Sequence, residues 1–269
     1  MTDSTLPLGE AVALGAIQGP TELLPVSSSG HLILVPALLD WHYSELDPEL
    51  RKSFEVALHA GGALALLIGL RREVREYVRS FGPANVVSLA LSFAPAALTA
   101  LLFERPIERR LGDPVPVAAA LLAGSAAMAL ADGAPEERTR DHAGPLDALA
   151  IGFAQAFALA PGVSRNGATL AAARLLRFRR ADANVISRQI ALPVILGAAA
   201  LKGARLAQRG VPREIARGMV VGAATAFAST LLSLRLITML ERSRSLRPYA
   251  AYRAAVGGAA LVVLWRRGA

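Results

Sequence analysis

The sequence contains no cysteine, and only 5% of its residues are aromatic. The absence of cysteine excludes disulfide bonds and metal sites built from thiolates. Acidic residues are also few, 21 against 29 lysines and arginines, which gives a formal net charge of +8. The basic residues are scattered through short connectors, such as residues 71–75 and 174–180, where they suit lipid headgroups better than a nucleic acid. We therefore expect membrane lipids as partners and no nucleic acid.

Apolar residues dominate the chain. They make up 54% of it, and the mean hydropathy is +0.43. Long apolar runs recur, each near the length that a helix needs to cross about 30 Å of hydrocarbon. The runs cover residues 54–70, 84–103, 115–131, 183–201, 216–240 and 250–265. They predict an all-α integral membrane protein with about six transmembrane helices and no soluble domain.

Two polar segments interrupt this apolar sequence. The first runs from Gln18 to His31 (QGPTELLPVSSSGH), and the second from Gln155 to Thr169 (QAFALAPGVSRNGAT). Irregular backbone at membrane depth is tolerated only where protein covers it or where it lines a wet cavity. Polar groups at that depth usually mark a site. We therefore expect two re-entrant helix-loop-helix segments that line a cavity.

The two segments indicate an internal repeat. Gly15 and Gln18 match Gly152 and Gln155, Pro25 matches Pro161, Ser28 matches Ser164, and Gly30 matches Gly167 after a one-residue slip. Three apolar runs follow each segment, and because three is odd the second copy must enter the membrane upside down. This predicts an inverted-topology repeat with halves at about 1–135 and 140–269. The whole chain, 1–269, is expected to form a single polytopic membrane domain with the site where the two segments meet.

The polar residues of the two segments suit phosphate chemistry. Hydroxyls and free backbone N–H groups at a helix start can cradle a phosphate, and a guanidinium matches its oxygens. The candidate catalytic residues are Glu22, Ser28, His31 and Arg165. The candidate phosphate-binding residues are Ser27, Ser29, Gly30, Gly162, Ser164, Asn166, Gly167 and Thr169. The alternatives are that Glu22 is a structural partner of Arg165, that the serines only cap a helix, and that His31 is an interfacial residue.

Residues outside the two segments are less informative. His59 lies beside two glycines in an apolar run, which favours a packed or cavity-lining role over a ligand role. Glu55 could face either water or the site. Arg188 and Gln189 interrupt another apolar run and either line the cavity or cap the bundle.

Residues 18–32 resemble the signature of the bacterial undecaprenyl-diphosphate phosphatase family associated with bacitracin resistance, with Leu23 in place of Phe. Residues 161–169 resemble that family's Pro-Gly-x-Ser-Arg-Ser-Gly-x-Thr, with Asn166 in place of Ser. Further landmarks at 54–56, 187–193 and 248–253 extend the resemblance over nearly the whole chain. The chain departs from the family pattern at Gln18, where many members carry a second carboxylate, at His59, where Gln is usual, and at Arg188 and Gln189, which replace apolar or aromatic residues.

The resemblance implies hydrolysis of undecaprenyl diphosphate to undecaprenyl phosphate and inorganic phosphate, which recycles the lipid carrier for cell-wall synthesis. It also implies a divalent cation, magnesium or calcium, held by Glu22 with Gln18, and a site on the outer face of the bacterial cell membrane. Arg165 would then hold the terminal phosphate. Ser28, preferred over Ser27, would be the nucleophile with His31 as its base or as the acid for the leaving group. Attack by a metal-activated water, with Ser28 only binding phosphate, is the competing mechanism.

A polyprenyl-phosphate flippase or transporter is the alternative function, because inverted repeats with broken helices are typical of transporters. Ser-x-x-His beside Glu22 and Arg165 favours hydrolysis, since transport does not need it. The basic residues are spread nearly evenly over the two sets of loops, so the positive-inside rule does not fix the orientation. The oligomeric state stays open, and a homo-oligomer is compatible with the sequence.

Overall fold

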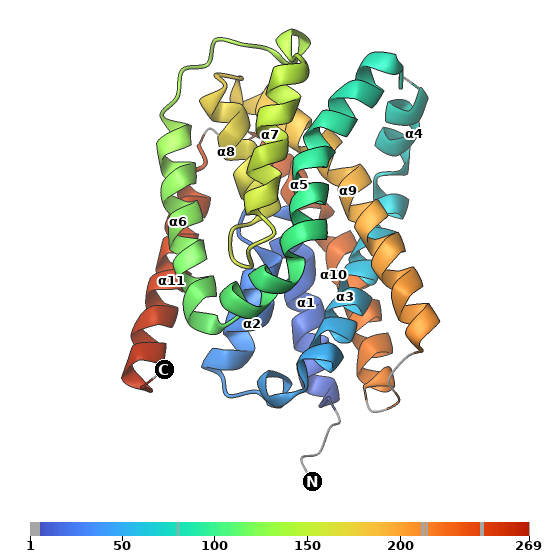
Figure 1. Cartoon of the computed structure of the whole chain (residues 1–269), viewed down its shortest axis with the longest axis vertical. Coiled ribbons are helices and arrows are strands. Elements are labelled where there is room, and N and C mark those ends of the chain that lie inside the picture. The colour runs from blue at the N-terminus through green and yellow to red at the C-terminus, as the bar shows by residue number, and fades with distance from the viewer. Residues whose placement is uncertain (1–5, 80, 211–212, 214, 243–244, 269) are drawn as a thin grey trace.

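The computed structural model describes residues 6–79, 81–210, 213, 215–242 and 245–268, and within these ranges the chain is built from helices (Figure 1). The prediction of an all-helical protein is confirmed. The elements are α1 Leu8–Leu23, α2 Ser28–Leu38, the 3-10 turn η1 His42–Glu45, α3 Pro48–Gly69, α4 Arg71–Arg79, α5 Pro83–Leu111, α6 Pro114–Asp132, the 3-10 turn η2 Arg140–His142, α7 Pro145–Phe157, α8 Arg165–Leu175, α9 Arg180–Arg209, α10 Ala216–Arg242 and α11 Arg247–Arg266.

The helices mark the chain as a multi-pass membrane protein. By length and composition, four of the described helices can cross a membrane, namely α5, α6, α9 and α10. The pair α3 and α4, bent by 72°, passes the same test as one span and raises the number to five. The prediction of about six spans is therefore met only in part. The sixth expected run lies on α11, a helix of 20 residues with Arg253 in its first two turns.

The two polar segments fold as pairs of short helices separated by a break. The first break, residues 24–27, joins α1 to α2, and the second, residues 158–164, joins α7 to α8. Figure 1 shows α1 running inward from the end of the molecule where the N-terminus lies, while α7 runs inward from the opposite end. Both breaks lie between these ends, in the interior of the helix assembly.

The halves share backbone features at one constant offset of 137 residues. The pairs related by this offset are the starts of α1 and α7 (Leu8 and Pro145), the whole spans of α2 and α8, and the left-handed residues Ser27 with Ser164 and Asp40 with Arg177. Packing follows the same relation. Helix α1 of the first half packs chiefly on α10, whereas α7 of the second half packs chiefly on α5.

Helix α1 is fixed against α10 by close backbone contact. Gly15 and Gly19, four residues apart, both face α10, and a Cβ on Gly15 would lie 2.6 Å from the Gly222 carbonyl oxygen. The hydroxyl of Ser229 donates to the carbonyl of Ala16 at 2.6 Å. Small residues at this spacing let membrane helices approach closely. The contact therefore fixes the rotation of α1, and with it the direction of Gln18 and Glu22.

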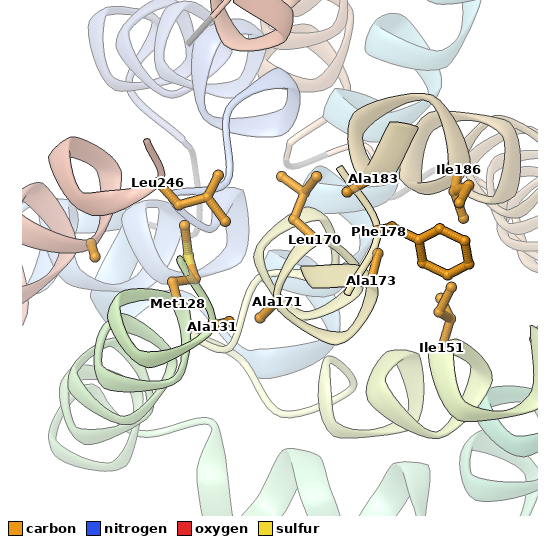
Figure 2. Packing of buried hydrophobic residues seen from close by; sticks show 11 residues of the cluster. Met128, Ala131, Ile151, Leu170, Ala171, Ala173, Phe178, Ala183, Ile186 and Leu246 are labelled. Atoms are coloured by element: carbon orange, nitrogen blue, oxygen red, sulfur yellow. The ribbon is translucent and has the colours of Figure 1, made fainter. Parts of the chain in front are cut away.

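A core cluster holds α7, α8 and α9 together. The ring of Phe178, which follows α8, lies between Ile151 of α7 and Ile186 of α9 (Figure 2). The guanidinium of Arg138, in the connector before α7, sits over that ring at 4.4 Å and also donates to Asp147 at the start of α7. These contacts hold the start of α7 next to the end of α8, and so fix the position of the break between the two helices.

Candidate active site

Each break ends in a serine that caps the helix after it. Ser27 has φ 77° and its Oγ accepts a hydrogen bond from the Gly30 N–H at 3.2 Å. Ser164 has φ 66° and its Oγ accepts from the Gly167 N–H, also at 3.2 Å. A left-handed backbone is costly for a residue with a side chain, and the cap bond offsets part of that cost. The two breaks are therefore built on the same local design.

This shared design changes the predicted register of the repeat. Ser27, and not Ser28, stands in the position of Ser164, and Gly30 then corresponds to Gly167 without a slip. Ser28 corresponds to Arg165, the first residue of α8. The sequence match failed because Pro25 and Pro161 were aligned as equivalents, although the breaks are organised by their capping serines.

Glu22 is the centre of a hydrogen-bonded group drawn from the helices that flank the two breaks. Its Oε2 accepts from the Ser28 hydroxyl at 2.7 Å, and its Oε1 accepts from Arg165 Nη2 at 2.7 Å. Gln18 Nε2 lies 3.4 Å from Oε2. The Glu22 side chain is 9% exposed and that of Arg165 is 22% exposed. The structure thus brings three of the four candidate catalytic residues into direct contact, and it also forms the Glu22–Arg165 pair of the structural alternative.

Backbone contacts join the two breaks directly. The Gly162 N–H donates to Ser29 Oγ at 3.5 Å, and Asn166 Nδ2 donates to the Leu23 carbonyl at 2.9 Å. Gly30 and Gly162 touch, since a Cβ on Gly30 would lie 3.4 Å from the Gly162 Cα. Gly162 itself has φ +96°, and a Cβ there would lie 2.4 Å from the Val117 carbonyl oxygen. Because these positions are glycine, the backbone of the second break can approach the start of α2 closely.

Both ring nitrogens of His31 contact groups other than Ser28. Its Nδ1 lies 2.7 Å from the carbonyl oxygen of Ser27, and its Nε2 lies 2.8 Å from the hydroxyl of Tyr252 on α11. The two rings are stacked, with centroids 5.7 Å apart and planes 5° from parallel. The predicted pairing of Ser28 with His31 as its base is therefore absent from this arrangement, and Glu22 occupies that place.

His59, by contrast, faces the group around Glu22. Its Nδ1 lies 3.0 Å from Gln18 Nε2 and 3.8 Å from Glu22 Oε2. The sequence left a choice between a packed and a cavity-lining His59, and the structure places it on the cavity wall. Glu55 of the same helix instead accepts from the Tyr43 hydroxyl at 3.1 Å, away from Glu22.

Thr169 and Gly167 support the site without lining the cavity. The Thr169 hydroxyl lies 2.6 Å from that of Ser187 on α9, and Ser187 donates to Asn166 Oδ1 at 3.0 Å. Because Asn166 also donates to the Leu23 carbonyl, these hydrogen bonds connect α9 to α8 and, through it, to the end of α1. Gly167 lies against the side chains of Arg253 and Met128.

Arg253 of α11 connects the two breaks through hydrogen bonds to their backbone carbonyls. Its side chain is fully buried (0% exposed). Nη1 donates to the Pro25 carbonyl at 3.2 Å, and Nη2 donates to the carbonyls of Gly162 at 3.0 Å and Val163 at 2.9 Å. A Cβ on Gly124 or Gly167 would collide with this guanidinium. Its five rigidly placed donors suit the bridging of several carbonyls.

A cavity of about 280 Å³ opens beside these groups. Its polar wall comes from the two polar segments and from α3. Its apolar wall comes from α3, α5 and α9 and from Ala158 and Leu159 of the second break. The polar lining residues are Thr21, Glu22, Ser27, Ser28, Ser29, His59, Gln155, Ser164, Arg165 and Asn166. His31, Gly30, Gly162, Gly167 and Thr169 are not among the residues that line it. The cavity therefore presents hydroxyls, one carboxylate and one guanidinium beside an apolar wall.

Comparison with known sequences places the chain in a family. The model of the family described as bacitracin resistance protein BacA matches residues 11–259, which include both breaks and Arg253. The chain belongs to this family. It is 38% identical to the undecaprenyl-diphosphatase of Geobacter sulfurreducens, over 96% of this chain and 98% of that protein. It is 36% identical to undecaprenyl-diphosphatase 1 of Burkholderia thailandensis, over 94% of each chain.

Two site residues escaped the sequence reasoning. Tyr252 and Arg253 were seen only as a landmark of the BacA family, with no role. The available signal was Arg253 itself, since an arginine in an apolar run must find partners. Its partners are backbone carbonyls, which the sequence does not display.

The residues around Glu22 offer few ligands for a cation. Among the described residues, no group of three His, Cys, Asp or Glu side chains could hold a metal ion. Gln18 lies one helical turn from Glu22, and its Oε1 is a buried oxygen without a hydrogen-bond partner among the described residues. Magnesium is commonly held by one or two carboxylates and completes its shell with water and substrate phosphates. Glu22 lines the cavity and offers a carboxylate of this kind, whereas Gln18 is fully buried, does not line the cavity and turns its Nε2 toward Glu22.

Proposed function

We propose that this chain hydrolyses undecaprenyl diphosphate to undecaprenyl phosphate and inorganic phosphate. Membership of the BacA family and the names of its relatives support this activity. The observation that carries it in the structure is the hydrogen-bonded series Ser28–Glu22–Arg165 on the wall of a cavity inside the helix assembly. A hydroxyl, a proton acceptor and a guanidinium in contact are the groups that phosphoryl transfer uses.

The cavity suits a substrate with one charged end and one apolar end. Its polar wall would receive the diphosphate, while the apolar wall from α5 and α9, with Ala96, Val194 and Ala198, would receive the first prenyl units. The remaining prenyl chain then stays in lipid. Arg165 would bind oxygens of the terminal phosphate and stabilise the charge that develops on them.

In the proposed reaction, Ser28 Oγ attacks the terminal phosphorus. The hydroxyl proton of Ser28 passes to Glu22, which already accepts a hydrogen bond from this hydroxyl. The bond between this phosphorus and the bridging oxygen breaks, and undecaprenyl phosphate leaves. Water then hydrolyses the phosphoserine, which releases inorganic phosphate and restores Ser28. His31, bonded to the Ser27 carbonyl and to Tyr252, would act as a positioning residue for the break. Direct attack by water, with Ser28 binding phosphate, is the other mechanism.

A magnesium or calcium ion would be held by Glu22 and Gln18 together with the diphosphate, and when bound it would neutralise phosphate charge. Gln18 Oε1 is buried without a partner among the described residues, and it would face the ion after the Gln18 amide turned over, because Nε2 is the atom directed at Glu22. The absence of a second carboxylate at this position favours an ion that arrives with the substrate over a permanently bound one.

The fold is proposed to be an inverted-topology repeat in the bacterial cell membrane. The constant offset of 137 residues supports the repeat, and the opposed directions of α1 and α7 support the inversion. The exchanged packing, α1 on α10 and α7 on α5, makes each half depend on the other, which favours one domain over the whole chain. We place the site on the outer face.

The decisive experiment measures phosphate release by the purified protein in detergent. Undecaprenyl diphosphate should be hydrolysed with no second compartment present, and magnesium or calcium should raise the rate. A flippase of polyprenyl phosphate would release no phosphate under these conditions, yet would move labelled lipid across a proteoliposome bilayer. Absence of hydrolysis with intact, monodisperse protein would contradict the proposed function.

A further inference from the structure

A second cavity lies on the other side of the Glu22–Arg165 pair. Its volume is about 60 Å³, against about 280 Å³ for the first. Glu22, Arg165 and Asn166 line both cavities, as does Ile195 of α9, so these four residues form the shared wall. The far wall belongs to α9, where Asn184 and Arg188 lie four residues apart and therefore on one face of the helix.

Two buried polar atoms of residues that line this cavity have no hydrogen-bond partner in the part of the chain that the structure describes. The Asn184 side chain is 7% exposed, and its Nδ2 donates to the Arg180 carbonyl at 3.0 Å, but its Oδ1 makes no hydrogen bond. Arg165 Nε is also buried without a partner, although Nη2 of the same side chain is bound to Glu22. Buried polar atoms in proteins are nearly always hydrogen-bonded. An unpaired acceptor and an unpaired donor at one cavity indicate a ligand that can both donate and accept.

The guanidinium groups at the cavity favour a ligand that accepts hydrogen bonds. Arg165 and Arg188 both line it. Glu22 offsets the charge of Arg165, and Glu73 of α4 interacts electrostatically with Arg188 from beyond the cavity lining. Most other lining residues are leucine and isoleucine. Apolar walls lower the local dielectric, so the attraction between guanidinium and anion is stronger than in water.

The size of the cavity selects among anions. A water molecule needs about 10–15 Å³ of volume measured in this way, so 60 Å³ accommodates an ion of a few heavy atoms and excludes a prenyl chain. A partly protonated phosphate has five heavy atoms, accepts from guanidinium groups and can donate an O–H to Asn184 Oδ1. We propose that this cavity is a subsite for a tetrahedral phosphate group, filled by free inorganic phosphate on the side of the Glu22–Arg165 pair away from Ser28. The identity of the anion, though not the existence of the subsite, rests on the proposed phosphatase function.

Equilibrium dialysis of radiolabelled inorganic phosphate against the purified full-length protein in detergent tests this proposal. The wild-type protein should bind phosphate in an Arg188-dependent class of site, which Arg188→Met should weaken at least about tenfold because a charge-assisted bond is lost. Asn184→Leu should weaken the same class by removing its acceptor. The matched control is Arg179→Met, which removes an exposed guanidinium at the start of the same helix. It should leave phosphate binding unchanged.

Farnesyl phosphate separates the two sources of a phosphate group. It should compete for the site at Ser28 and leave the Arg188-dependent binding in place. Displacement of both classes would overturn the assignment to free phosphate in favour of a lipid headgroup. Unchanged phosphate binding in Arg188→Met and in Arg188→Lys, with both proteins monodisperse, would overturn the subsite itself. Since binding needs no turnover, these outcomes are independent of whether the protein hydrolyses undecaprenyl diphosphate.

Discussion

At the scale of single residues, Glu22 is the group on which the largest number of site contacts converge. Glu22→Gln keeps the volume but leaves one oxygen to accept from both Ser28 and Arg165, and it turns an NH₂ toward one of these donors. We expect the hydrolysis rate to fall by about 10²- to 10³-fold, the usual cost of losing one such electrostatic contact. Expression and the thermal midpoint in detergent should stay near wild type.

The control for this variant is Glu137→Gln, which changes an exposed carboxylate paired with Arg177 on the connector surface. It should retain full activity. Raising the magnesium or calcium concentration should recover part of the rate of Glu22→Gln if its defect lies in cation binding. A Glu22→Gln enzyme that works within a factor of three of wild type would show that the Glu22–Arg165 pair is only structural.

The serines of the first break have different expected roles. Ser27→Ala removes a helix cap, so it should cost about 1 kcal/mol of stability and affect turnover indirectly. Ser28→Ala removes the hydroxyl bonded to Glu22, so turnover should be abolished while stability is kept. Rapid quenching of wild type with labelled substrate should trap a phosphoserine.

Ser164→Ala is the matched control for the cap, because Ser164 makes the same bond to the N–H three residues later. It should lower the thermal midpoint as much as Ser27→Ala does. Measurable turnover in Ser28→Ala without any phosphoenzyme would favour direct attack by water.

The residue-level predictions succeeded where contacts are local. Gln18 and Glu22 lie on one helix face as their spacing indicated, and Ser27 caps α2. His31 was assigned by its distance in sequence from Ser28, but a residue at the start of a helix can turn either way. Its direction is set by Tyr252, which lies on another helix and makes a contact that no local pattern displays.

At the scale of elements, α11 controls how the two breaks meet. Arg253→Met should leave the carbonyls of Pro25, Gly162 and Val163 buried without donors, which costs about 1–3 kcal/mol for each group. We expect a large fall in the thermal midpoint in detergent together with a loss of activity. Arg253→Lys should recover only part of both, because one ammonium cannot reach three carbonyls.

Tyr252→Phe, on the neighbouring residue, keeps the ring stacked on His31 and removes only its hydroxyl. It should change the midpoint little. If Arg253→Met unfolds no more easily than Tyr252→Phe, the bridge formed by Arg253 contributes little to holding the breaks.

The connector between the halves is fastened to the start of α9, and this contact titrates. The pKa of Glu136 lies below its usual value because its carboxylate accepts from the Arg180 backbone N–H, at 3.1 Å, and faces the Arg180 guanidinium. A lowered carboxyl pKa adds stability above the pKa of the unfolded chain, and that stability is lost as pH falls through the folded pKa. Glu136→Gln should therefore lower the thermal midpoint at pH 7, and its difference from wild type should shrink below about pH 4.5.

Asp141→Asn, at an exposed position of the same connector, serves as the control and should show no such convergence. A constant difference between Glu136→Gln and wild type from pH 7 to pH 4 would show that the charge of Glu136 does not act through Arg180.

At the scale of the whole molecule, hydropathy predicted where the helices lie but not how many of them can cross the membrane. All six apolar runs lie on helices. However, α11 carries Arg253, whose guanidinium binds a carbonyl of the second break, and α3 continues into α4 through a sharp bend. Matching glutamine and serine positions in the two halves of the sequence predict the repeat, which stays a prediction. The sequence did not predict its register, since the register depends on the left-handed backbone at Ser27 and Ser164, which no residue type specifies.

The topology can be tested by labelling, because the chain has no native cysteine. The bent pair α3 and α4, and the helices α5 and α6, lie between η1 and the connector at residues 133–144. Three crossings by these helices would put η1 and the connector on opposite faces. Figure 1 shows them at opposite ends of the molecule. Val56 lines both the active-site cavity and a wider opening with Lys52, near the start of α3 and so at the end that carries η1. With the site on the outer face, this end faces outward.

Single cysteines at two exposed positions, Glu45→Cys in η1 and Ala143→Cys in the connector, should therefore label differently. A membrane-impermeant maleimide applied to intact spheroplasts should modify Glu45→Cys, and it should modify Ala143→Cys only after permeabilisation. The reverse pattern would keep the inverted repeat and move the site to the inner face. Equal labelling of both positions in sealed cells would contradict three crossings per half, and with them the proposed inversion of the second half.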